Sequence, residues 1–115
     1  MGLLTTHILD TAEGGPAAGV DIRLFLLGEQ RQRVAFATTN ADGRTEHPLL
    51  EGTAMATGTY ELEFDIGDYY RSNNVAIGKP AFLDTVVIQF SIQHDEHYHV
   101  PLLCSPWSYT TYRGS

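Results

Sequence analysis

Hydrophobic and polar residues alternate along much of this chain, the pattern that predicts half-buried β-strands. The clearest case is GTYELEFDI at residues 58–66, where Tyr, Leu, Phe and Ile alternate with Glu and Asp. Residues 20–27 and 83–92 alternate in the same way, so each should turn one apolar face toward a core. Shorter strands, rich in β-branched and aromatic residues, are expected at 5–10, 33–39, 97–104 and 108–113.

The segments between these strands carry residues typical of turns. EGGPAAG, GEQRQ, NADG and CSPW are rich in Gly, Pro, Asn or Asp, or are otherwise polar. Only GDYYRSNNV, at residues 67–75, is compatible with a helix, and its length allows about two turns. Seven or eight short strands separated by tight turns predict an all-β sandwich with one short helix.

Length and charge limit the classes of partner. A chain of 115 residues fits a single domain covering 1–115 and can bury one core. Its net charge of −7 argues against nucleic acid or an anionic membrane surface as the main partner. No apolar run approaches the length that crosses a membrane. We therefore expect no nucleic-acid partner and no membrane association.

The single cysteine indicates a reducing compartment and a structural role. With only Cys104, the chain can form no internal disulfide, so we expect a cytoplasmic protein. Alternation in HYHVPLLC places Cys104 on the same face as Tyr98, Val100 and Leu102. We therefore expect Cys104 to be a small core residue rather than a nucleophile.

Three histidines and one arginine have no evident structural reason. Alternation places His97 and His99 on the face opposite Cys104, about 6–7 Å apart along the strand. In TTHILD it groups Thr5, His7 and Leu9 on one face. Arg44 follows the turn NADG, where an arginine is usually solvated.

These histidines admit three interpretations. In the first interpretation they are solvated surface residues. In the second they bind a metal together with other groups of HDEHYH, such as His94. In the third, one of them transfers protons. No third metal ligand is fixed by spacing, and imidazole titrates near neutrality, which favours proton transfer. The residues alone do not decide among the three.

Four segments together resemble a known family. LTTHILDTAEGGPAAGV, TNADGRT, HYHVPLLCSPWSYTTYRGS and the closing YRGS resemble the 5-hydroxyisourate hydrolases of the transthyretin-like protein family. The similarity runs from end to end of the chain. HYHVPLL and YRGS are specific to the enzyme branch, whereas the hormone carrier transthyretin lacks the two histidines, the arginine and the tetrapeptide.

The resemblance implies a transthyretin-like (prealbumin-like) β-sandwich of two four-stranded sheets. It also implies a homotetramer, a dimer of dimers with a central channel. In that arrangement His7, Arg44, His99 and Ser115 lie on the first, fourth, seventh and eighth strands. Those four strands form one sheet whose outer face lines the channel.

The resemblance further implies an activity and its residues. The substrate would be 5-hydroxyisourate, hydrolysed in urate degradation without a metal or an organic cofactor. His99 would activate water, His7 would hold the water or shuttle the proton, and Arg44 would bind the carbonyl edge of the substrate. The catalytic set would be His7, Arg44, His99 and Ser115, and substrate would be bound by His7, Arg44, Tyr112, Arg113, Gly114 and Ser115.

Two further expectations concern the alternative function and the tail. The alternative is a non-enzymatic carrier that binds a small aromatic ligand in the same channel. The tail should be ordered and form part of the site, with Gly114 allowing a backbone turn that a Cβ would hinder.

Overall fold

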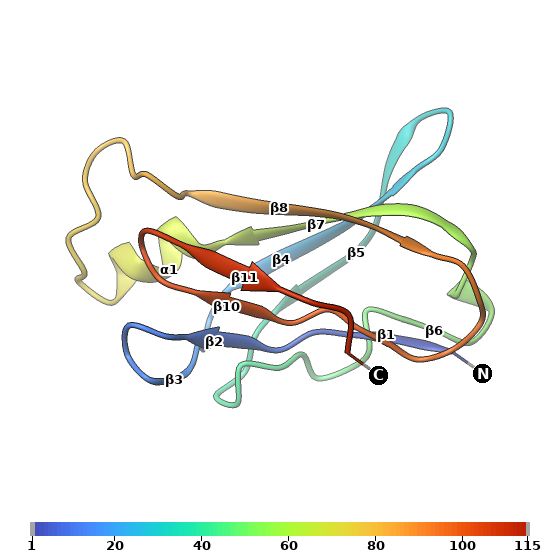
Figure 1. Cartoon of the computed structure of the whole chain (residues 1–115), viewed down its shortest axis with the longest axis horizontal. Helices are drawn as coiled ribbons and strands as arrows, with labels where there is room; N and C mark the ends of the chain where they lie inside the picture. The colour runs from blue at the N-terminus through green and yellow to red at the C-terminus, as the bar shows by residue number, and fades with distance from the viewer. Residues whose placement is uncertain (1, 115) are drawn as a thin grey trace.

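The computed structural model describes residues 2–114 and shows two packed β-layers (Figure 1). The first layer is one antiparallel sheet of four strands in the order β5-β4-β7-β8. These strands match the segments with the strongest alternation. Their bounds are Asp21–Leu27 for β4, Arg31–Thr38 for β5, Gly58–Asp65 for β7 and Thr85–Ile92 for β8.

The second layer is divided by short breaks into two sheets, ordered β6-β1-β9 and β11-β10-β2-β3. Its strands are β1 (Leu3–Thr5), β2 (Ile8–Asp10), β3 (Gly15–Pro16), β6 (Leu50–Glu51), β9 (Tyr98–His99), β10 (Leu102–Cys104) and β11 (Tyr109–Thr111). Backbone pairing continues across the breaks, because Val100 N donates to Thr5 O at 2.9 Å and Leu102 N donates to His7 O at 2.9 Å. Residues 3–10 and 98–104 therefore run as one long parallel pair.

The predicted all-β sandwich with one short helix is confirmed. The helix α1 (Ile66–Ser72) begins one residue before the segment expected to be helical and ends three residues before that segment does, and a 3-10 turn η1 covers Gly52–Ala54. Some details differ from expectation. Strand β5 begins two residues early, at Arg31, and the short strands β3 and β6 carry too few residues to show alternation. No helix within the described residues is long and apolar enough to cross a membrane.

The core lies between the layers and follows the alternation. Tyr60, Leu62 and Phe64 of β7 are at most 1% exposed, as expected for the apolar face of that strand. Cys104 is also buried, and burial raises the pKa of its thiol to about 11. The expectation that Cys104 is a core residue is confirmed.

A buried carboxylate ties the helix to the second layer. Asp10, only 4% exposed, accepts hydrogen bonds from the hydroxyls of Tyr69 (2.9 Å) and Tyr70 (3.0 Å) of α1. It also accepts from the backbone N–H groups of Ala12 and Glu13, which closes the turn after β2. Burial raises the pKa of both tyrosines, so their hydroxyls stay protonated and act as donors.

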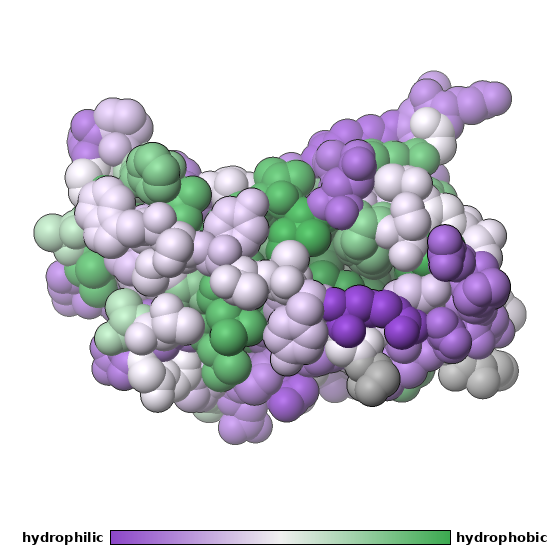
Figure 2. Space-filling model, in the orientation of Figure 1, coloured by the Kyte–Doolittle hydropathy of each residue, from purple (hydrophilic) through white to green (hydrophobic). Residues whose placement is uncertain are grey.

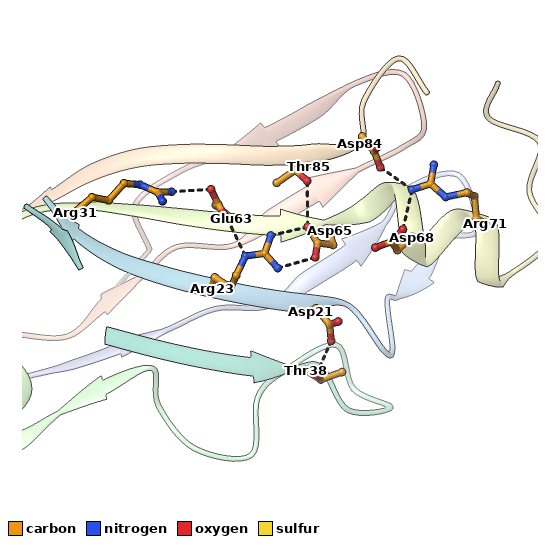
Figure 3. Close-up of polar contacts among 10 residues, drawn as sticks. All are labelled: Asp21, Arg23, Arg31, Thr38, Glu63, Asp65, Asp68, Arg71, Asp84 and Thr85. Atoms are coloured by element: carbon orange, nitrogen blue, oxygen red, sulfur yellow. Dashed lines mark hydrogen bonds and ion pairs between the residues drawn. The ribbon is translucent and has the colours of Figure 1, made fainter. Parts of the chain in front are cut away.

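The outer face of the first sheet is covered by ion pairs (Figure 3). Arg23 of β4 binds Asp65 through two nitrogens, at 2.7 and 2.8 Å, and Glu63 at 2.9 Å. Arg31 joins Glu61 and Glu63 in the same set. The Arg23 guanidinium lowers the pKa of Asp65. Arginines of β4 and β5 thus pair with the acidic side chains on the outer face of the alternating strand β7.

We expect Asp10→Ala to lower the free energy of unfolding by about 2–4 kcal/mol, because two buried tyrosine hydroxyls and two backbone N–H groups lose their acceptor. Denaturant unfolding followed by circular dichroism measures this loss. Asp68→Ala is the control, since Asp68 is 73% exposed and solvent screens its ion pair with Arg71, which should contribute little to stability. Equal midpoints for the two variants would contradict a stabilising role of Asp10.

Candidate active site

Strand pairing brings the candidate residues into one row across the second layer. His7 and Arg44 form an antiparallel bridge, and Thr5 lies opposite His99 in the parallel pairing of β1 with β9. His99 in turn bridges to Gly114, whose N–H donates to His99 O at 2.7 Å. Four separate parts of the chain therefore meet within the width of a few strands.

The row lies on the face turned away from the core. Thr6 and Ile8 are buried between the layers, whereas His7 between them is only half-buried. In the same way Tyr98 and Val100 are buried and His99 is half-buried. Because successive strand residues point to opposite faces, His7 and His99 share the outer face, as the alternation predicts.

The turn NADG holds Arg44 beside His7. The Asn40 side-chain oxygen accepts from the N–H of Asp42 at 2.9 Å and from that of Arg44 at 3.2 Å. Gly43 has φ of 73°, and a Cβ there would collide with the carbonyl oxygen of Ile8. Only glycine fits this turn without strain, so the turn brings the backbone of residues 43 and 44 close against β2.

The tautomer of His7 follows from its partner. His7 Nε2 lies 2.9 Å from the carbonyl oxygen of Asp42. A carbonyl only accepts, so Nε2 must carry a proton and donate it. In neutral His7 the lone pair is then on Nδ1, which can accept a hydrogen bond from water or from a substrate.

His99 is held and tuned by its surroundings. Its Nδ1 lies 2.9 Å from the Thr5 hydroxyl, which leaves Nε2 as the second ring nitrogen. Burial lowers the pKa of His99, and electrostatic repulsion from Arg44, and from His7 and His97 whenever they carry a proton, lowers it further. His99 is therefore a neutral imidazole at neutral pH, the form that can take a proton from water.

Arg44 supplies an accessible cation next to the histidines. Its side chain is exposed, and no ion pair within residues 2–114 neutralises it. It lines a pocket of about 140 Å³ together with Thr5, Thr6, Thr45, Glu46, His47 and Pro48. A planar guanidinium at a polar pocket suits a ligand with several carbonyl groups.

Gly114 lies next to His99 for a different reason from the backbone turn that was expected. Gly114 is outside the left-handed region, so no unusual turn requires a glycine there. Instead, an added Cβ would lie 3.1 Å from both Cβ and Cδ2 of His99. The absence of a side chain lets the backbone of the tail pack against the imidazole.

The other residues of the tail are placed as follows. Tyr112 is 58% exposed and follows β11. The Arg113 guanidinium pairs with Glu96 at 2.8 Å, and its Cζ lies 4.3 Å from the centre of the Tyr98 ring, on the side of the strand opposite His99. Ser115, expected to be catalytic, lies outside the described residues.

The described part of the chain gives no support to the metal interpretation. It contains no group of three or more His, Cys, Asp or Glu side chains that could hold a metal ion. His97 instead places Nε2 at 2.9 Å from the Thr5 hydroxyl. Thr5 is the residue that the sequence analysis missed, although alternation had placed it on the same face as His7.

Several known proteins are similar to this chain over nearly its whole length. A 5-hydroxyisourate hydrolase from Ralstonia nicotianae is 55% identical over 117 aligned residues, covering 100% of both chains. Among solved structures, Klebsiella pneumoniae 5-hydroxyisourate hydrolase has a TM-score of 0.84 and 32% identity, again covering 100% of both chains. An (S)-allantoin synthase has a TM-score of 0.95 and 45% identity over 99% of this chain, which spans 44% of that longer protein.

The model of one family matches nearly the whole described chain, residues 4–114. The chain therefore belongs to the HIUase/Transthyretin family.

Proposed function

We propose that this protein is a hydrolase that opens the ring of 5-hydroxyisourate to give 2-oxo-4-hydroxy-4-carboxy-5-ureidoimidazoline, a step in urate degradation. The observation that carries the proposal is the row formed by Arg44, His7 and His99 on the outer face of the second layer. Full-length identity of 55% to a protein of that name supports the same substrate.

In the proposed reaction His99 is the general base. Its Nε2 takes a proton from water while the water oxygen bonds to a ring carbonyl carbon. His99 then returns the proton to the ring nitrogen as the C–N bond breaks, so the base is regenerated. The lowered pKa of His99 favours the first step, because the imidazole is unprotonated before it meets water.

The neighbouring residues orient water and substrate. His7 Nδ1 accepts a hydrogen bond from the attacking water, since Nε2 is occupied by the Asp42 carbonyl. Arg44 binds the carbonyl edge of the flat substrate and stabilises the oxyanion. Tyr112, Gly114 and Ser115 complete the binding surface, and Arg113 helps to hold the tail through its pair with Glu96.

We also propose a homotetramer, a dimer of dimers, in which the sites line a central channel. The exposed edge strands β8 and β11 support such an assembly, because each lies at the end of its sheet. Between them is a pocket of about 270 Å³, lined by Ile88, Phe90, Val100 and Tyr112 among others. Figure 2 shows apolar surface in this region. Unpaired apolar edges of this kind favour association.

The test of the function is an ultraviolet assay with freshly generated 5-hydroxyisourate. Decay of its absorbance should be faster with the protein than without it. The carrier alternative predicts binding without decay. The side chains at the site argue against the carrier alternative. Two imidazoles and a guanidinium suit a polar reacting ring better than an apolar hormone-like ligand.

We expect His99→Ala to lower kcat by about 10²–10⁴-fold, the usual contribution of a general base. The matched variant His97→Ala should lose much less activity, because His97 reaches the site only through Thr5. Steady-state kinetics on both variants decide the matter. A larger loss in His97→Ala would show that the base has been assigned to the wrong histidine.

We expect Arg44→Glu to abolish activity without unfolding the protein, since Arg44 is exposed and outside the core. The charge reversal should also raise the pKa of His99, because a carboxylate stabilises the imidazolium that Arg44 destabilises. Titration of the His99 ring by NMR measures this shift without depending on activity. In the wild type the midpoint should lie below about 6.5, the ordinary value. A midpoint unchanged by the substitution would place Arg44 too far from His99 to act with it.

Deleting residues 113–115 should lower kcat/KM by about 10²-fold while leaving a folded β-protein. The deletion removes the Gly114 N–H that donates to His99 O, but it leaves β11 and the core intact. Circular dichroism and sedimentation control for folding and assembly. Full activity in the truncated assembly would exclude the tail from the site, and dissociation would mean that it acts through assembly.

A further inference from the structure

The hydroxyl of Thr5 lies between two imidazoles. Thr5 Oγ1 is 2.9 Å from His99 Nδ1 and 2.9 Å from His97 Nε2. The arrangement results from register, because Thr5 of β1 pairs with His99 of β9 and His97 precedes that strand on the same face. Thr5 also lines the pocket that Arg44 lines.

The number of available protons limits the hydrogen-bond directions that are possible among His97, Thr5 and His99. A threonine hydroxyl has one proton to donate and lone pairs with which to accept. With both imidazoles neutral, it donates to one nitrogen and accepts from the N–H of the other. If Thr5 donates to His97, then His99 carries its proton on Nδ1 and has its lone pair on Nε2. If Thr5 donates to His99, then His99 carries its proton on Nε2 and cannot take one from water there.

We propose that Thr5, with His97 as the acceptor of its proton, is a positioning residue that fixes His99 in the tautomer with a free lone pair on Nε2. This inference rests on the proposed function, in which His99 is the base. The Nδ1–H of His99 donates to Thr5 Oγ1, and the Thr5 hydroxyl donates to His97 Nε2. These hydrogen bonds fix both the orientation and the tautomer of the His99 ring. The hydrogen bond made by one ring nitrogen of a histidine commonly decides which nitrogen carries the proton.

The surroundings permit this direction of the hydrogen bonds, and the proposed role of His99 as the base requires it. His97 is exposed, so its Nδ1–H can be solvated while Nε2 accepts from Thr5. Arg113 lies near the His97 carbonyl oxygen, at 3.5 Å, and Glu96 holds Arg113. The charged and titratable groups around His99 are Arg44, His7 and His97, and all three disfavour an extra proton on its ring.

The test compares Thr5→Val with Thr5→Ser. Valine keeps the shape of threonine and replaces the hydroxyl with a methyl group, so kcat should fall by about 10–10²-fold with little change in KM, a smaller loss than that expected for His99→Ala. Serine keeps the hydroxyl and should retain nearly wild-type kcat. Thr38→Val is the matched control, because the Thr38 hydroxyl is also bonded to a side chain, Asp21, but on the other sheet. It should leave the kinetics unchanged.

A direct readout comes from the nitrogen NMR shifts of the His99 ring in the protein without substrate. The wild type should show a protonated Nδ1 and an unprotonated Nε2, and Thr5→Val should shift the population toward protonated Nε2. A wild-type His99 protonated on Nε2, or kinetics of Thr5→Val equal to wild type, would overturn the inference. If the wild type failed to hydrolyse 5-hydroxyisourate, the proposed function would fall, whereas the NMR result would still report on the tautomer.

Discussion

The parallel pairing of residues 3–10 with residues 98–104 is the constraint on which both the core and the candidate site depend. Its register places Leu4 beside Tyr98, Thr5 beside His99 and Ile8 beside Leu102. The even-numbered members fill the core, and the odd-numbered Thr5, His7 and His99 lie at the candidate site. A slip of one residue would exchange the two faces and would send His99 between the layers. The packing free energy of the core therefore also fixes the positions of the imidazoles.

The distribution of charge separates the two outer faces of the sandwich. Glu61, Glu63 and Asp65 lie on the outer face of the first sheet, where Arg23 and Arg31 bind them. Figure 3 shows Arg23 bound to Glu63 and Asp65, and Arg31 bound to Glu63. The outer face of the second layer carries imidazoles and the exposed Arg44 instead. A chain with net charge −7 thus presents at the candidate site one cation, Arg44, that no ion pair within residues 2–114 neutralises. Such a cation suits a substrate that develops negative charge on oxygen during attack by water.

The sequence predicted those features that depend on local periodicity. Alternation identified the long strands, the apolar face that contains Cys104 and the outward position of His7 and His99. It could not identify the role of Thr5, because threonine is an ordinary strand residue and its contacts come from residues 92 and 94 positions away. Gly114 was also singled out from the sequence, but the reason given for a glycine at that position was wrong. Its close approach to His99 follows from tertiary pairing, which no local pattern of residues contains.

The same parallel pairing has a consequence for folding during synthesis. The hydroxyl of Thr6 binds the carbonyl of Val100, a residue 94 positions later in the chain. During synthesis, residues 3–10 therefore keep one edge unpaired until residues 98–104 have been made. Contacts of such large sequence separation close slowly, and an apolar strand with an open edge is prone to wrong partners in the meantime. The strand pairing that aligns the candidate site is thus also the part of the fold for which we expect the greatest need of a chaperone during folding.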